Sequence, residues 1–497
     1  MSQPLFILSV IAAYLLIWMA VAFFTSRGAD NSTFFSGGRK MPWPLVAIAM
    51  IGAPISGVTF ISVPGMAVAK GYSYLQMGLG FITGYLLIAF VLIPVYYRFN
   101  IISVYGYLER RFGSTTSKTG AWLFFVSKLL GISVRFLVVC AMLQLLIFEP
   151  LGVSYLVSVA VSLLFIWATT FRGGVKSVIW GDVLKSFCLI SAIILCLVFI
   201  ASNLGLSPLD IPSRIMVHES SRMFFFDDPS DAKFFWKQFV AGIFLVIAMT
   251  GLDQDMMQRT LACRNARDSR KNLMVSSVMQ FVVMACLLLL GTMMILFSRA
   301  NGLDIPEKSD NLFASVAFAE GIPVIVGVLF VLGLVSATFS SVGSALTAMT
   351  TTMTVDILEA HKSCSPSSLT ARRHLVHLLV SLSMAVLVVF FYYLNSDDAL
   401  SMVYTLVSYS DGPILGLFVF GLFTRRDVNE SLLPVVCLLA PILSWALQWC
   451  AGHFLDYTIS FELLIINAAL TFCGLWLLSK PAPSPEASGA IDKPASL

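Results

Sequence analysis

The segment Trp43–Ala69 is apolar and long enough to cross a bilayer, yet glycine and proline interrupt it. Its central stretch, Gly52–Gly65, reads GAPISGVTFISVPG. A helix in lipid must satisfy its own backbone hydrogen bonds, because the bilayer core offers no water. Each proline removes a donor and crowds the carbonyl one turn earlier. The stretch therefore predicts one of two structures. One is a kinked helix packed through small residues; the other is a helix that opens near the midplane, with free carbonyls lining a cavity or binding an ion.

The rest of the chain is equally apolar. Of its 497 residues 58% are hydrophobic and 12% are charged, whereas a soluble domain carries about 25% charged residues. We therefore predict an all-α polytopic membrane protein. Windows of about 20 apolar residues predict thirteen transmembrane helices, at 4–25, 43–69, 74–97, 118–148, 153–171, 177–202, 234–258, 272–298, 323–356, 374–395, 399–424, 431–451 and 457–479.

The lysines and arginines outside these helices are distributed unevenly. Most of them fall in one alternating set of loops, and cytoplasmic loops are the ones enriched in basic residues. This bias predicts a multi-pass protein of the cell membrane, in contact with the lipid bilayer, with its N-terminus outside and its C-terminus in the cytoplasm. The first apolar run, at 5–24, is expected to stay as a helix rather than to be a signal peptide. Residues 481–497 are rich in Pro, Ser and Ala and are expected to form a disordered cytoplasmic tail.

A few ionisable residues lie inside the predicted helices, where a charge usually faces a cavity or a partner. Arg135 is either an anchor for an acidic solute group or the partner of Asp182 or Asp411. Asp182 is three residues before Lys185, so the two side chains can pair on one helical face. Alternatively, Asp182 is a sodium ligand, because hard cations prefer oxygen. Lys128 shares a face with Arg135 and can snorkel toward the inner surface.

A stripe of hydroxyl groups follows the helix predicted at 323–356. Its members share one helical face and are Ser340, Ser344, Thr347, Thr351 and Thr354. One interpretation is close packing, with each hydroxyl bonded to a backbone carbonyl of its own helix. The other is an ion path or ion site.

The chain shows no motif for catalysis or nucleotide binding. Its five histidines lack HExxH spacing, and neither a P-loop nor GxSxG occurs. We therefore predict that the protein is not an enzyme. The net charge of +4 indicates no nucleic-acid partner. Without a site for ATP, an ion gradient is the expected source of work.

From about residue 5 to 480 the chain resembles the sodium:solute symporter family. The spacing is similar to that of the bacterial sialic-acid members, including an arginine at Arg135. The matching motifs are FFSGGRKMPW (34–43), GAPISGVTFISVPG (52–65), YLERRFG (107–113), FRGGVKSVIWGDVLK (171–185), DQDMMQRTLACRNA (253–266), SSVGSALTAMTTTMTVDI (340–357) and DGPILGLFVFGLFTRR (411–426).

The resemblance implies a LeuT-type fold of two inverted repeats, each of five helices, within one transmembrane domain at 1–480. The repeats would span 43–202 and 234–424, with an extra helix at 4–25 before them and two more at 431–479. The opening helix of each repeat would be broken, the second near Gly242 or Gly251.

The resemblance also implies the ligands of a co-transported sodium ion. The common sodium site falls on the carbonyls of Gly52, Ile55 and Ala337 and the hydroxyls of Ser340 and Ser341. A second site, found in some members, falls on Asp182, Ser340, Ser341, residue 343 and Ser344. Gly343 replaces a serine there, so one hydroxyl is missing.

A monomeric symporter of a small organic solute is therefore the expected function. The expected solute contacts are Ser56, Thr59, Tyr74, Gln76 and Arg135. Arg135 favours a carboxylate such as a sialic acid, although Pro54 and Gly78 stand where the sialic-acid members have threonine and glutamine. A sugar or amino-acid symporter and a membrane sensor that does not transport are the alternatives.

Overall fold

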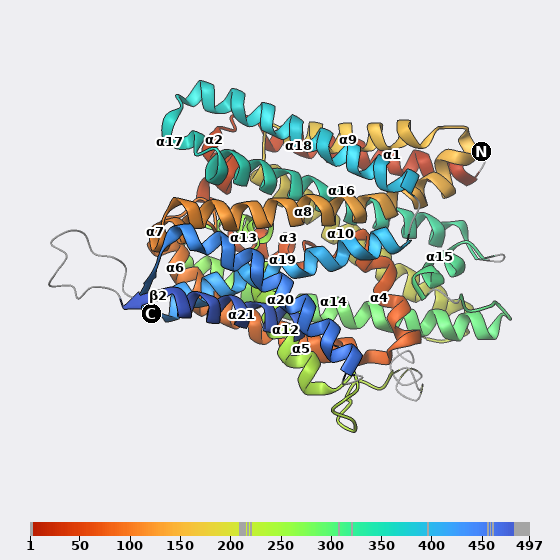
Figure 1. Ribbon diagram of the computed structural model, residues 1–497. Helices are drawn as coiled ribbons and strands as arrows, with labels where there is room; N and C mark the ends of the chain where they lie inside the picture. Colours follow the sequence, from red (N-terminus) through yellow and green to blue (C-terminus); the bar gives the residue numbers. More distant parts are fainter. Residues whose placement is uncertain are drawn as a thin grey trace.

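The computed structural model describes residues 3–207, 215, 218, 221–306, 309–319, 322–394, 397–454, 457, 459 and 462–481. Helices make up nearly all of the described structure. Figure 1 shows the long helices lying side by side along one direction, with α18, α9 and α1 at one edge and α5 and α12 at the opposite edge. The tail predicted to be disordered lies, from residue 482 on, outside the described residues.

The elements of the described chain run as follows. The helices are α1 (Gln3–Thr25), α2 (Asn31–Ser36), α3 (Trp43–Gly52), α4 (Gly57–Ala69), α5 (Tyr74–Leu87), α6 (Ile93–Arg98), α7 (Gly106–Phe112), α8 (Ser114–Leu143), α9 (Tyr155–Thr170), α10 (Val175–Asn203), α12 (Phe235–Val246), α13 (Gln254–Thr260), α14 (Ala266–Ala300), α15 (Leu312–Ala317), α16 (Val324–Thr352), α17 (Ala360–Ser363), α18 (Pro366–Leu394), α19 (Asp397–Phe423), α20 (Leu433–Phe454) and α21 (Glu462–Leu478). Two short antiparallel strands, β1 (Arg426–Val428) and β2 (Ser479–Pro481), pair with each other.

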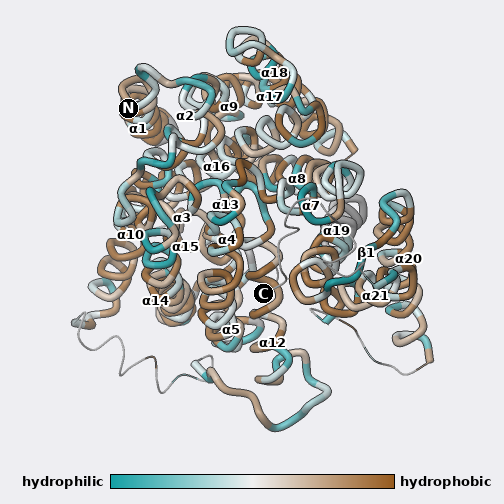
Figure 2. Tube along the Cα trace, turned by 90° about the vertical axis from the view of Figure 1, so that its left-hand side faces the viewer, coloured by the Kyte–Doolittle hydropathy of each residue, from teal (hydrophilic) through white to brown (hydrophobic). Residues whose placement is uncertain are grey.

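The structure confirms an all-helical chain with many apolar spans. Among the described residues eight helices are long and apolar enough to cross a membrane, or ten if each of two bent pairs is counted as one span. Three shorter apolar helices lie at Tyr155–Thr170, Tyr409–Phe423 and Glu462–Leu478, within ranges predicted to span. The count of thirteen therefore stays a prediction. Figure 2 shows apolar residues dominating the long helices, as expected for segments surrounded by lipid and by one another.

The helix predicted at 43–69 is broken in the structure. Its halves α3 and α4 are bent by 60° at the break, residues 53–56. Ser56 caps the second half, because its hydroxyl accepts a hydrogen bond from the Thr59 amide. Pro64 and Gly65, in contrast, lie inside the continuous helix α4. There the packing interpretation holds, because a Cβ at Gly65 would overlap Ser309, and a Cβ at Gly291 would overlap the Pro64 carbonyl.

A second broken helix opens the second half of the fold. A π-helical turn, Ile247–Gly251, continues α12, and the chain then turns by 73° into α13. Asp253 caps α13 by accepting hydrogen bonds from two backbone amides of its first turn. The break expected near Gly242 or Gly251 thus follows Gly251. Gly242 has another role, because its missing side chain lets α12 approach the Met77 carbonyl closely.

Candidate functional site

Helix α10 packs against both α3 and α16, so it lies next to the first break and next to the hydroxyl stripe. On the α3 side the Ser186 hydroxyl accepts a hydrogen bond from the Gly52 amide at 3.1 Å and donates to the Ile48 carbonyl at 2.8 Å. These are the two backbone groups that a helix pairs with each other at this position. A buried serine of α10 therefore adds hydrogen bonds to the last turn of α3.

On the α16 side the contact comes from the preceding residue of α10. The Lys185 ammonium donates to the Ser341 hydroxyl at 3.1 Å, and that hydroxyl donates to the Ala337 carbonyl at 2.8 Å. Lys185 is fully buried. Residues expected to form the two halves of the sodium site, Gly52 and Ser341, thus contact neighbouring residues of one helix.

The first break and α16 also touch directly. Gly57 opens α4 at a point where a Cβ would overlap the Thr338 hydroxyl, so α4 and α16 approach closely because residue 57 has no side chain. Within the break the Ile55 amide donates to the Gly52 carbonyl at 3.0 Å. Among the described residues, nothing donates a hydrogen bond to the Ile55 carbonyl. A backbone oxygen of this kind can bind a cation.

A buried network of charged side chains lies next to the contact between α10 and α16. The Arg259 guanidinium of α13 binds the Asp182 carboxylate at 2.7 Å and Asp255 at 3.1 Å. The Lys128 ammonium of α8 binds Asp253 at 2.9 Å and Asp255 at 2.8 Å. The pairing of Asp182 with Lys185, one of the two interpretations above, is wrong: Asp182 reaches α13 instead. Lys128 likewise pairs with carboxylates rather than snorkelling.

Two hydroxyls of α16 complete this network. Ser340 donates to Asp182, and Ser344 donates to Asp255. A side chain at Gly343 would point elsewhere, toward Thr170 of α9. The residues predicted for a second sodium site are therefore close together, but both carboxylates already face Arg259.

The members of the hydroxyl stripe have different hydrogen-bond partners. The first two, Ser340 and Ser344, donate to carboxylates. Thr347 and Thr351 donate to carbonyls of their own helix, at 3.0 Å and 2.9 Å, so the packing interpretation is right for them. The Thr354 hydroxyl is buried without a hydrogen-bond partner among the described residues.

Three network residues, Asp253, Asp255 and Arg259, were not among the predicted site residues. Arg259 falls one residue beyond the helix predicted at 234–258 and is therefore counted with the basic residues of the loops. The available signal was that both aspartates fall inside the range predicted as a helix, 234–258.

Helix α8 contacts both breaks, and Arg135 lies on α8 between these two points of contact. Lys128, seven residues earlier, binds Asp253 at the second break, and Val139, four residues later, lies against Gly57 at the first. Residues at these spacings share a helical face. The half-buried Arg135 forms no ion pair with any described residue. Its charge acts on Asp411 of α19, but the two groups are not in contact.

The remaining predicted solute contacts divide between the break and the chain before α12. The Ser56 and Thr59 hydroxyls lie 3.1 Å apart at the start of α4. The Gln76 amide is buried and engaged with the chain before α12: it donates to the Lys233 carbonyl at 2.8 Å and accepts from the Phe225 amide at 3.0 Å. Tyr74 packs edge-on against Phe81. The structure therefore brings Ser56 and Thr59 together but ties Gln76 to the loop.

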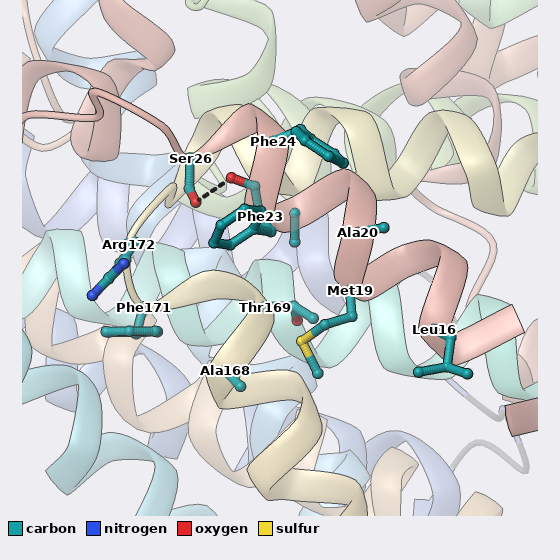
Figure 3. Close-up of a pocket in the computed structure, with 11 residues that line it drawn as sticks. Leu16, Met19, Ala20, Phe23, Phe24, Ser26, Ala168, Thr169, Phe171 and Arg172 are labelled. Atoms are coloured by element: carbon teal, nitrogen blue, oxygen red, sulfur yellow. Dashed lines mark hydrogen bonds between the residues drawn. The ribbon is translucent and has the colours of Figure 1, made fainter. Parts of the chain in front are cut away.

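A groove on the outside of the fold is separate from all these residues. It has a volume of about 410 Å³ and lies between the end of α1 and α9. Figure 3 shows apolar side chains such as Met19 and Phe23 along it, with Arg172 at its edge. It contains none of the predicted site residues.

Comparisons with known proteins give matches over most of the chain. A family model described as the sodium:solute symporter family matches residues 34–431. The sodium/sialic acid symporter NanT of Aliivibrio fischeri is 25% identical over 469 residues, which are 91% of this chain and 90% of that protein. The human sodium/iodide cotransporter is 25% identical over 415 residues, 82% of this chain and 63% of that protein. The chain thus matches less than two thirds of the human protein's length.

Solved structures share the fold. A sodium-coupled sialic acid symporter in a substrate-bound, outward-open state superposes with a TM-score of 0.81 at 18% identity, covering 97% of this chain and 99% of that one. A nucleobase-cation-symport-1 family transporter gives a TM-score of 0.57 at 13% identity, covering 88% and 92%. At these identities the likeness concerns the fold alone.

Proposed function

Since this chain belongs to the sodium:solute symporter family and is thereby a sodium-coupled symporter, we propose that the solute it imports is a carboxylate such as a sialic acid. Sodium is the co-transported ion. The observation that carries the proposal is Arg135, a half-buried guanidinium in a membrane helix with no ion pair among the described residues. Such a group usually has a partner, and a carboxylate is the bidentate partner that a guanidinium fits best.

The position of Arg135 supports this role. It lies between the two breaks, on the face of α8 that meets Gly57. Ser56 and Thr59 begin α4 beside that glycine, and their hydroxyls would bind the polar groups of the same solute. We leave Gln76 and Tyr74 as weaker candidates, because the Gln76 amide is already hydrogen bonded at both ends.

We propose that sodium binds the carbonyls of Gly52, Ile55 and Ala337 and the hydroxyls of Ser340 and Ser341. Gly52 and Ser341, one from each half of this site, contact consecutive residues of α10, and this supports the assignment. Sodium would hold the first break against α16, and solute binding would then favour closure on the outer side. Coupling is the difference in stability of the two states with and without the ion. A second ion at Asp182 and Ser344 would have to share Asp182 with Arg259, so we favour one ion per cycle.

The proposed topology is thirteen spans in two inverted five-helix repeats, 43–202 and 234–424, in a monomer. The two bent pairs support it, because each opens one of these repeats. The N-terminus would be outside and the C-terminus cytoplasmic. In a cysteine-free background an impermeant thiol reagent should then label a cysteine at Ser230 in intact cells but not one at Ser363. Labelling of Ser363→Cys in intact cells would reverse the orientation.

Uptake into proteoliposomes tests the solute class. With an inward sodium gradient we expect accumulation of a sialic acid or another carboxylate, and no accumulation when potassium replaces sodium. Arg135→Gln should reduce carboxylate uptake about tenfold or more, because a charge-assisted bidentate contact is lost. Arg172→Gln, at the peripheral groove, is the matched control and should transport normally. Uptake of neutral sugars alone, unchanged by Arg135→Gln, would contradict the proposal and favour the sugar alternative. Solute-dependent stabilisation without any transport would favour the sensor.

A further inference from the structure

Lys185 is a buried cation that the ion-pair network does not use. Its side chain is fully buried, and among the described residues its ammonium forms one hydrogen bond, to the Ser341 hydroxyl at 3.1 Å. Asp182, one turn earlier on α10, binds Arg259 instead. No carboxylate among the described residues forms an ion pair with Lys185. An ammonium has three donors, so two of them have no hydrogen-bond acceptor among the described residues.

The oxygen that Lys185 contacts is one of the proposed sodium ligands. Ser341 gives its proton to the Ala337 carbonyl at 2.8 Å and presents its lone pairs to the ammonium. A sodium ion that used the same hydroxyl would place a second positive charge beside the first. Because both cations would lie within contact distance of one oxygen in a buried site, their repulsion is weakly screened.

The sum of the charges around Lys185 also indicates that its ammonium and a sodium ion exclude each other. The buried network holds three carboxylates, Asp182, Asp253 and Asp255, and two paired cations, Lys128 and Arg259. These five groups sum to one negative charge, and the Lys185 ammonium brings the sum to zero. Lys185 therefore supplies the single positive charge that a sodium ion would otherwise supply.

We propose that the Lys185 ammonium is a tethered competitor of sodium at Ser341, and that it sets the sodium affinity of this transporter. Sodium binds when the ammonium leaves Ser341, and the ammonium returns when sodium leaves. The protein thus keeps the site neutral in both states. This inference rests on the proposed sodium site but concerns a residue outside that site's ligand set.

Sodium binding to the purified protein tests the inference without measuring transport. Radiolabelled sodium binding, or the sodium dependence of the melting temperature, gives the half-saturating concentration. Lys185→Gln keeps a donor for Ser341 but removes the charge, so we expect half-saturation at a sodium concentration about tenfold lower. Lys185→Arg keeps the charge and should stay close to wild type. Lys176→Gln, near the start of the same helix, is the matched control and should not change sodium binding.

The result that would overturn the proposal is a sodium affinity in Lys185→Gln equal to or weaker than that of the wild type. Should that variant not fold, Lys185→Met provides the same test with a side chain of similar length. Ser341→Ala distinguishes an error in the proposed sodium site from an error in the role of Lys185. If it leaves sodium binding of the wild type unchanged, the proposed sodium site is wrong. If it weakens sodium binding while Lys185→Gln fails to strengthen it, only the role of Lys185 is wrong.

Discussion

Arg259 and Asp182 form an ion pair at 2.7 Å in which neither side chain is more than 1% exposed. Removing one partner of such a pair leaves a buried charge without compensation, which typically costs about 3–5 kcal/mol. We expect Arg259→Gln to lower the melting temperature sharply. The double variant Asp182→Asn with Arg259→Gln should be more stable than the single variant, because no lone charge remains. A double variant that is less stable than Arg259→Gln would contradict this account.

The two parts of the hydroxyl stripe should respond differently to loss of a hydroxyl. Ser340→Ala removes a proposed sodium ligand that also donates to Asp182, so the sodium concentration for half-maximal uptake should rise, by about tenfold or more. Thr351→Ala removes only a bond within its own helix and should leave sodium dependence unchanged. Sodium titration of uptake in both variants is the measurement. Equal shifts would mean that the stripe acts as a whole.

Gly57 is needed for the contact between α4 and α16. In Gly57→Ala the new methyl group would overlap the Thr338 hydroxyl, which is held by its own bond to the Leu334 carbonyl at 2.8 Å. Overpacking of this kind costs about 1–3 kcal/mol, and it should also weaken sodium binding by separating the two helices. Gly452→Ala is the matched control, because a Cβ there meets nothing within 4 Å. Comparable thermal shifts in the two variants would refute the role of Gly57.

Ser186→Ala tests the bridge at the end of α3. Its hydroxyl accepts from the Gly52 amide and donates to the Ile48 carbonyl, and each hydrogen bond lost typically costs about 0.5–1.5 kcal/mol. We therefore expect lower stability and weaker sodium binding, because the Gly52 carbonyl shifts with its peptide. Ser381→Ala, whose hydroxyl bonds within its own helix at 2.8 Å, should be nearly neutral. Sodium-dependent melting curves distinguish the two.

Glu359, in the connection after α16, should contribute to stability in a pH-dependent way. Hydrogen bonds from Lys362 and Lys118 lower the pKa of its carboxyl to about 2, whereas an unfolded glutamate has a pKa of about 4.3. A group with a lowered folded-state pKa stabilises the fold above the unfolded pKa and loses that effect as the pH falls. Glu359→Gln should therefore melt slightly below wild type at pH 7, and the difference should shrink between about pH 4.3 and 2. Glu149→Gln, at an exposed turn, serves as control; a difference independent of pH would exclude this mechanism.

Much of the backbone architecture could be predicted because its causes are local. Apolar length predicts a span, and glycine with proline inside a span predicts a break. The break at residues 53–56 and the turn after Gly251 agree with this reasoning. The same reasoning overextended the first break to Pro64, because a proline inside a helix can be accommodated by close packing, here against α14.

The pairing of charges could not be predicted because it depends on a third helix. Asp182 and Lys185 are spaced to pair with each other, yet α10 presents one to α13 and the other to α16. Which interaction forms is decided by Arg259, whose position follows from the 73° bend before α13. The hydrogen-bond partners of the α16 hydroxyls depend on the same neighbouring helices.

Lys185 and Ser186 are consecutive, so their side chains leave α10 about 100° apart. One reaches the hydroxyl of α16 and the other reaches into the backbone of α3. Because both contacts come from one helix, a movement of α10 at Ser341 is also a movement at Gly52. A change at the α16 hydroxyl and a change at the first break are then one motion of a single rigid helix, and no long relay of residues is needed to connect them.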